Sequence, residues 1–83
     1  AFPESLLNAL GYRLLSLGRP ADAVALFELN AAEFPASANV YDSLGDGYAE
    51  LGDRPRAVRA YQRSLALDPA NAHAAERIAA LSP

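Results

Sequence analysis

The feature that most constrains this chain is its repetition at an interval of 34 residues. The pairs related by this interval include Leu10-Gly11 and Leu44-Gly45, Ala23-Val24 and Ala57-Val58, and Pro35 and Pro69. The two copies align without an insertion or a deletion. A fixed period of this length indicates one supersecondary unit stacked on a copy of itself, because a single unit cannot bury its apolar face alone.

Helical periodicity runs through the whole sequence, and residues that start or stop helices mark its boundaries. We expect helices over residues 3–17, 20–33, 38–51, 54–67 and 72–81. Gly18 and Gly52 supply the left-handed residue that ends a helix. Ser37, Asp53 and Asn71 are good N-cap residues. Because the connections are short, successive helices should pack as antiparallel neighbours, which predicts an all-α fold in a single domain, residues 1–83.

The composition narrows the classes of function that such a fold can serve. A net charge of −3 argues against nucleic acid as a partner, because phosphate binding needs a basic surface. No apolar run is long enough for a membrane span, and no signal sequence is visible, so the segment is expected to be soluble. The chain starts with Ala rather than Met, which indicates a fragment of a longer or processed protein. All seven basic residues are Arg, which is typical of GC-rich bacterial genes. The sequence does not distinguish the bacterial cytoplasm from the periplasm as the location of the protein.

Two kinds of residue in the repeat predict close packing between helices. Gly11 and Gly45 lack a side chain, so the two helices of a unit can approach closely at these positions. Phe27 and Tyr61 also recur at the 34-residue interval and are expected to fill the space between units.

The repeated residues resemble the tetratricopeptide repeat, whose pattern is W-x2-L-G-x2-Y, then A-x3-F, then P. The second copy carries Tyr41, Leu44, Gly45, Tyr48, Ala57, Tyr61 and Pro69, and the first carries Leu7, Leu10, Gly11, Leu14, Ala23, Phe27 and Pro35. The resemblance implies two helix-turn-helix units, about 4–37 and about 38–71, and a C-terminal capping helix, about 72–81. It also implies a right-handed superhelical array and a protein–protein interaction module that binds a peptide or partner segment in its concave groove.

A second resemblance concerns the strings that start at Asn8 and Ser37. They are similar to the C-terminal repeat tail of some bacterial serine hydrolases of the beta-lactamase-like and esterase types. That resemblance implies a catalytic domain upstream and a structural accessory or dimerisation role for this segment. The first helix also carries more leucines than one buried stripe needs, which favours an attached upstream domain or weak self-association. The alternative is ordinary partial exposure of scattered leucines.

The residue types that usually perform catalysis do not form a recognisable set. His73 is the only imidazole, and a histidine near a helix start is typically an exposed surface group. Asp42 and Ser43 are adjacent on a helix and point about 100° apart, so neither can activate the other directly. Gly45-Asp46-Gly47 lacks the third glycine and the preceding strand of a dinucleotide-binding loop. With one His and no Cys, we expect no metal site. The incomplete glycine pattern predicts no cofactor, and the lack of a catalytic set predicts no enzyme activity.

Acidic residues line one face of the third predicted helix. Asp42, Asp46 and Glu50 are spaced four apart and therefore fall in one line along the helix. In the family that the chain resembles, the first helix of each unit lines the concave groove. That correspondence places Ser5, Asn8, Tyr12, Leu15, Asn39, Asp42, Asp46, Ala49, His73 and Glu76 in the groove. The alternative is a solvated helix face, with Arg13 and Arg77 relieving the repulsion between carboxylates.

The charge of this groove predicts the kind of peptide that it takes. Family members that hold chaperone tails use a clamp of Lys, Asn and Arg around a terminal carboxylate, whereas this face has carboxylates and no Lys. Repulsion between facing carboxylates would oppose an acidic tail. A protein or peptide partner should therefore be neutral or basic, with an apolar contact to Tyr12 and Leu15.

A basic cluster lies outside the expected groove, on and just before the fourth predicted helix. Its members are Arg54, Arg56, Arg59 and Arg63. This cluster is either an outer surface that keeps the protein in solution or a basic ridge that steers a partner.

Overall fold

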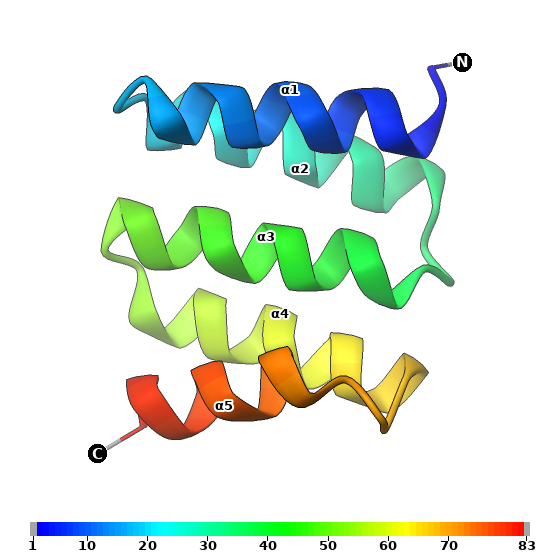
Figure 1. The fold of residues 1–83 in the computed structure, drawn as a ribbon, viewed down its shortest axis with the longest axis vertical. Coiled ribbons are helices and arrows are strands. Elements are labelled where there is room, and N and C mark those ends of the chain that lie inside the picture. The colour runs from blue at the N-terminus through cyan, green and yellow to red at the C-terminus, as the bar shows by residue number, and fades with distance from the viewer. Residues whose placement is uncertain (1, 83) are drawn as a thin grey trace.

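The structure is a computed structural model that describes residues 2–82, and all regular structure in this range is helical. The helices are α1 (Glu4–Ser16), α2 (Pro20–Glu33), α3 (Ala38–Leu51), α4 (Arg54–Leu67) and α5 (Ala72–Leu81). Each helix packs against the next one along the chain, and α1 also contacts α3. Figure 1 shows the helices side by side along the long axis, with α1 at one end and α5 at the other. The expected all-α array of two hairpins and a final helix is confirmed.

The helix boundaries repeat at the interval found in the sequence. Glu4, Ala38 and Ala72 begin α1, α3 and α5, and each start lies 34 residues after the one before. Gly18 and Gly52 follow the first helix of each hairpin with φ of 72° and 86°, in the left-handed region that glycine adopts without strain. α1 is one residue shorter at each end than expected, because its flanking residues already leave the helical conformation. Within residues 2–82, no helix is both long and apolar enough to cross a membrane.

Two of the three expected N-caps are confirmed and the third is wrong. The Asp53 carboxylate accepts a hydrogen bond from the backbone N–H of Arg56 at 3.2 Å, and the Asn71 side-chain oxygen accepts one from Ala74 at 3.3 Å. Ser37 precedes α3, but its hydroxyl donates to Glu4 Oε1 at 2.5 Å instead of capping its own helix. The competing partner on α1 explains the difference, and the Ser37 contact joins the starts of α1 and α3.

Glycines at two equivalent positions let the helices of each hairpin approach closely. A Cβ at Gly11 would lie 2.2 Å from the ring of Phe27, and a Cβ at Gly45 would lie 2.5 Å from the ring of Tyr61. Both rings are fully buried. Phe27 also reaches the next hairpin, because a Cβ at Gly47 of α3 would lie 2.9 Å from its ring. The predicted close approach within each unit is therefore confirmed, as is the role of Phe27 between units.

One continuous core joins the hairpins and the final helix. Its buried residues are Ala23, Val24, Phe27 and Ala31 of α2, Val40, Leu44 and Tyr48 of α3, Ala57, Ala60 and Tyr61 of α4, and Ala74 of α5. Two buried polar residues, Asn30 and Ser64, occupy equivalent positions in the two units. Asn30 donates to the carbonyl of Glu4 at 3.0 Å, and Ser64 donates to the carbonyl of Ala38 at 2.7 Å. In each hairpin the second helix is thus tied to the start of the first.

Candidate functional site

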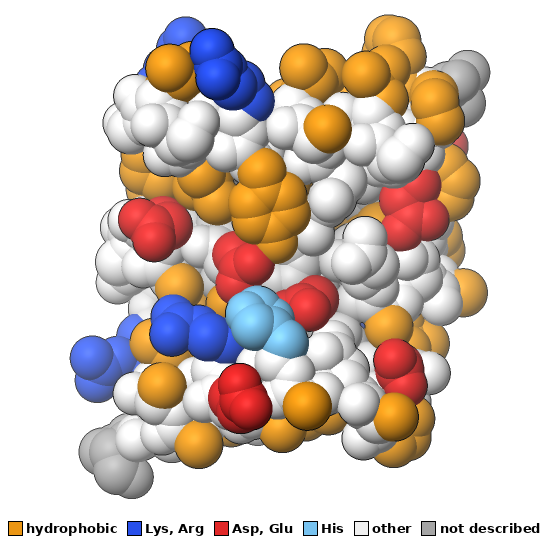
Figure 2. Space-filling model, viewed as in Figure 1, with side chains coloured by type: hydrophobic (Ala, Val, Ile, Leu, Met, Phe, Trp, Pro, Cys, Tyr) orange, Lys and Arg blue, Asp and Glu red, His pale blue; other side chains and the backbone are white. Residues whose placement is uncertain are grey.

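α1, α3 and α5 each contribute side chains to one open hollow. Its volume is about 510 Å³, and it is lined by Tyr12, Leu15, Ser16, Asp46, Ala49, Glu50 and Arg77. Figure 2 shows a face of the molecule on which a histidine side chain lies among acidic side chains, with a basic one beside them. The first helix of each hairpin and the final helix therefore build one surface from three successive units.

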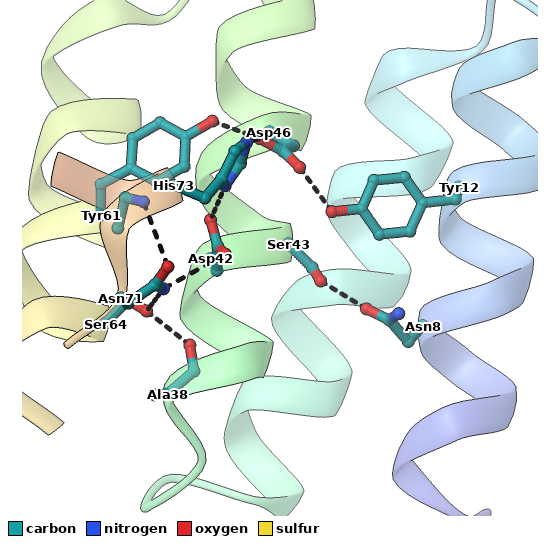
Figure 3. Close-up of polar contacts among 11 residues, drawn as sticks. Asn8, Tyr12, Ala38, Asp42, Ser43, Asp46, Tyr61, Ser64, Asn71 and His73 are labelled. Carbon is teal, nitrogen blue, oxygen red and sulfur yellow. Dashed lines mark hydrogen bonds and ion pairs between the residues drawn. The ribbon is translucent and has the colours of Figure 1, made fainter. Parts of the chain in front are cut away.

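Asp46 is the centre of the polar contacts beside this hollow (Figure 3). Its Oδ2 accepts a hydrogen bond from the hydroxyl of Tyr12 on α1 at 2.5 Å, and its Oδ1 accepts one from the hydroxyl of Tyr61 on α4. Tyr12 and Asp46 lie 34 residues apart, at the same position of successive units. The carboxylate therefore links α1, α3 and α4, and both of its oxygens are engaged within the protein.

Both tyrosine hydroxyls are protonated at neutral pH, and burial raises their pKa values further. Loss of water around Tyr12 raises its pKa above the ordinary value, and its hydrogen bond to Asp46 raises it further. The same two causes, in the same order, raise the pKa of Tyr61. Both side chains are therefore hydrogen-bond donors toward Asp46 at neutral pH. The pKa of Arg77 is also raised, first by the Tyr61 hydroxyl, and its guanidinium, which is charged at neutral pH in any case, lies at the α5 edge of the hollow.

His73 joins α5 to α3 on the same side of the molecule. Its Nδ1 lies 2.8 Å from Asp42 Oδ1, and its Nε2 lies 3.9 Å from Asp46 Oδ1. Asn71, which caps α5, donates to Asp42 Oδ2 at 3.2 Å and to the Ser64 hydroxyl at 2.9 Å (Figure 3). The side chain of His73 is 50% exposed. The sequence interpretation was therefore right about its exposure but missed its pairing with Asp42.

The structure brings together only part of the predicted groove set. The predicted residues that line the hollow are Tyr12, Leu15, Asp46 and Ala49. The other predicted residues, Ser5, Asn8, Asn39, Asp42, His73 and Glu76, lie outside its lining. Asn8 instead accepts a hydrogen bond from the buried hydroxyl of Ser43, and Asp42 and His73 bond each other. Ser16, Glu50 and Arg77 complete the lining and were absent from the predicted groove set.

Within residues 2–82, Asp42, Asp46 and His73 form a group that could hold a metal ion. Each offers one ligand atom, and these atoms lie within 4.8 Å of one another. Ligands about 2.0 Å from a tetrahedral zinc ion stand about 3.3 Å apart, so an ion would have to draw these side chains together. The same oxygens already accept hydrogen bonds from tyrosine and asparagine side chains. The arrangement is thus complete as a hydrogen-bonded cluster.

Several polar residues of this cluster escaped the sequence interpretation because they lie on second helices or in a loop. Tyr61 and Ser64 belong to α4, and Asn71 lies before α5. Alignment of the two units offers one usable signal. It places Tyr12 and Asp46 in the same register on neighbouring first helices, where a hydroxyl and a carboxylate can meet.

Comparison with known proteins agrees with the repeat architecture. Residues 38–71 match the tetratricopeptide repeat family. The Hsp70-Hsp90 organizing protein of Triticum aestivum is 41% identical over 58 residues, which are 70% of this chain and 10% of that protein. The chain therefore spans only a small part of this curated relative. Both findings support the resemblance to tetratricopeptide repeats and indicate a protein–protein interaction module. Neither supports the resemblance to serine-hydrolase tails or a bacterial source.

Proposed function

We propose that this chain, in which residues 38–71 form a tetratricopeptide repeat, binds a peptide or extended partner segment in the hollow between α1, α3 and α5. The observation that carries this proposal is the open hollow of about 510 Å³ with walls from three successive units. Leu15 and Ala49 are half-buried and Tyr12 is 37% exposed, so the walls offer apolar contact. Glu50 and Arg77 supply charges of opposite sign at the same place.

The charge around the hollow favours a neutral or basic occupant. Four carboxylates lie on α3 and α5, namely Asp42, Asp46, Glu50 and Glu76. The basic groups on α5 are the guanidinium of Arg77 and the imidazole of His73. Because the oxygens of Asp46 already accept two hydroxyl groups, the exposed Glu50 is the carboxylate best placed to meet a cationic side chain. The wheat relative is named for Hsp70 and Hsp90. A chaperone segment with an acidic end would meet this same row of carboxylates, which disfavours it.

The test is a titration of the 83-residue chain with matched basic, neutral and acidic peptides, with binding mapped by amide chemical shifts. Basic and neutral peptides should perturb the residues around the hollow. Glu50→Lys should weaken the basic peptide about three- to tenfold, since it replaces an attraction by a repulsion. Glu33→Lys is the matched control, because Glu33 is an exposed acid near the end of α2 and lies outside the hollow. Preferential binding of the acidic peptide in the hollow would refute the proposal.

A second role, self-association through α1, is favoured by the exposure of its leucines. Leu6 and Leu10 are 40% and 45% exposed. Their equivalents in the second unit, Val40 and Leu44, are 1% and 9% exposed because they face the core that α2 shares with α3. The face of α1 that includes Leu6 and Leu10 thus has the composition of a covered surface. We propose that a second copy of the chain covers it.

Sedimentation at increasing protein concentration tests this second role. A monomer–dimer equilibrium is expected, and Leu10→Glu should shift it to monomer. Leu17→Glu is the control, because its equivalent Leu51 remains 43% exposed within the array and so does not mark a covered position. A chain that stays monomeric at millimolar concentration would rule out self-association.

A further inference from the structure

A second hollow lies on the opposite side of α3 from the first. It has a volume of about 320 Å³ and is lined by Tyr41, Leu44, Tyr48, Arg56, Arg59, Ala60 and Arg63. Successive residues of a helix are rotated by about 100°, which places Tyr41, Leu44 and Tyr48 about half a turn away from Asp46, Ala49 and Glu50. The two hollows share no lining residue, so each can be occupied independently.

Three arginines of α4 border this second hollow. They are spaced three and four residues apart, which puts them on one face of the helix. The guanidinium of Arg63 lies 5.6 Å from the centre of the Tyr41 ring, an arrangement that holds the charge in place over an aromatic face. Arg56 is paired only loosely, at 3.6 Å, with Asp53. Within residues 2–82, Arg59 and Arg63 form no ion pair.

Two carboxylates beside the cluster, those of Glu28 and Asp53, offset only part of its three positive charges. Glu28 accepts a hydrogen bond from the hydroxyl of Tyr48 at 2.6 Å, and Asp53 caps α4. The floor of the hollow consists of Leu44, Ala60 and the ring of Tyr48, and each of these residues is less than 10% exposed. The hollow therefore combines a buried apolar floor with a rim of exposed positive charge, which suits an apolar side chain flanked by anionic groups.

The first unit shows that packing of the hairpin does not require this rim. Arg56, Arg59 and Arg63 correspond to Asp22, Ala25 and Leu29. The pair at the start of the second helix is even reversed in sign, since Arg19 and Asp22 of the first unit stand where Asp53 and Arg56 stand in the second. The same backbone arrangement thus carries one acidic and two apolar residues in the first unit and three arginines in the second.

We propose that this basic hollow between α3 and α4 binds an acidic peptide segment of a partner protein, with a leucine or aromatic side chain on the apolar floor and carboxylates at the arginines. Arginine suits this task because its planar guanidinium donates two parallel hydrogen bonds to a carboxylate. Phosphate presents the same anionic chemistry, so inorganic phosphate serves as a second arm of the test. This site is separate from the hollow proposed above to take neutral or basic peptides.

The experiment titrates the isotope-labelled 83-residue chain with a blocked peptide of alternating Glu and Leu, and maps amide shifts. A peptide with Gln in place of Glu and inorganic phosphate are titrated in parallel. The acidic peptide should perturb Tyr41, Leu44, Tyr48 and residues 56–63, and leave Ser16 and Arg77 unmoved. Arg59→Glu should weaken it about tenfold, from one lost attraction and one new repulsion. The Gln peptide should bind at least about tenfold more weakly.

Arg54→Glu is the matched control, because it makes the same change of charge on α4 outside the lining of the hollow. It should change the affinity less than about twofold. Equal losses from Arg54→Glu and Arg59→Glu would show a general charge effect and overturn the site. Equal affinity of phosphate and the acidic peptide would overturn the apolar part of the recognition. Perturbation confined to the first hollow, concentration-dependent shifts of these residues without any peptide, or no binding at millimolar peptide would each overturn the proposal as a whole.

Discussion

Phe27 in the first hairpin and Tyr61 in the second occupy the same position of the repeat, and each presses its ring against the glycine of its partner helix. They differ by one hydroxyl group, which in Tyr61 donates to Asp46. Asp46 in turn stands where the first unit has Tyr12. The rings follow the repeat because each must fill the same gap. The hydroxyl and the carboxylate do not follow it, because they belong to a network in which Asp46 accepts from Tyr61 of its own unit and from Tyr12 of the other.

The arginines and tyrosines extend this difference. The second unit has Tyr41, Tyr48 and Arg63 where the first has Leu7, Leu14 and Leu29. At these three positions the first unit thus has leucines, whereas the second has two hydroxyl groups and a positive charge. The shared positions hold the array together, and the positions that differ distinguish the surfaces available to partners.

The largest effect should come from filling the close contacts that the two hairpins share. Gly11→Ala and Gly45→Ala each put a Cβ into a buried ring and should lower the free energy of unfolding by about 2–3 kcal/mol, despite the better helix propensity of Ala. Gly11→Ala should lower the free energy of unfolding more than Gly45→Ala does. The ring of Phe27 also packs against α3 near Gly47, so it cannot shift away from the added Cβ. Urea unfolding followed by circular dichroism measures both.

The control for this pair is Gly18→Ala, where nothing lies near the added Cβ but φ is 72°. It should cost about 1 kcal/mol from backbone strain alone. A neutral or stabilising result for Gly11→Ala or Gly45→Ala would mean that the rings move aside freely, and the shared packing would lose its explanation.

The next largest effect should come from the carboxylate at the centre of the second unit. Asp46→Ala leaves the fully buried Tyr61 without its acceptor and should cost about 2 kcal/mol of unfolding free energy. Glu50→Ala, one turn further along α3 and exposed, should change it by less than about 0.5 kcal/mol. Equal effects of the two substitutions in the same urea experiment would show that the Asp46 contacts contribute nothing beyond a surface charge.

Removing single hydroxyls should have a smaller effect. Tyr61→Phe gives the second unit the ring chemistry of the first and should cost about 1 kcal/mol. Tyr12→Phe should cost about 0.5 kcal/mol, since Tyr12 is 37% exposed and water can replace part of its bond. Combined with Asp46→Ala, each substitution should cost less than it does alone, because the shared acceptor is already gone. Additive costs in these double variants would contradict a bond through Asp46.

The helices and their close contacts were predictable because their causes are local or strictly periodic. Gly18, Gly52 and Asp53 act on their own stretch of backbone, and the Gly11–Phe27 contact recurs as Gly45–Tyr61. The composition of the hollow was only partly predictable. The resemblance to the family assigns the first helix of each unit to the groove and so places Tyr12 and Asp46 on one face. It does not say that their side chains bond each other.

Partners of a polar group depend on the relative placement of three helices, and local rules do not supply that placement. Ser37 illustrates the limit. It has the residue type and position of an N-cap, yet its hydroxyl bonds Glu4, which lies 33 residues away in sequence. The pairing of His73 with Asp42 was missed for the same reason, since it requires α5 to lie against the face of α3.

The smallest effect concerns alkaline pH, at which the contribution of the Tyr48 hydroxyl of the second unit to stability can be measured. Burial, and then the bond to Glu28, raises the pKa of Tyr48 to about 12, whereas its equivalent Leu14 does not ionise. The unfolded chain loses the Tyr48 proton near its ordinary pKa of about 10 while the folded chain keeps it. The stabilising contribution is therefore complete below about pH 10 and is lost as the pH rises from about 10 to about 12. At pH 10 the loss should be about 0.4 kcal/mol.

Melting temperatures between pH 8 and pH 11 should fall less steeply in Tyr48→Phe than in the parent chain. A slope should remain from Tyr12 and Tyr61, whose pKa values are also raised. Parallel curves would show that the Tyr48 hydroxyl is no better shielded in the folded protein than in the unfolded chain, and the difference between Tyr48 and Leu14 would then have no effect on alkaline stability.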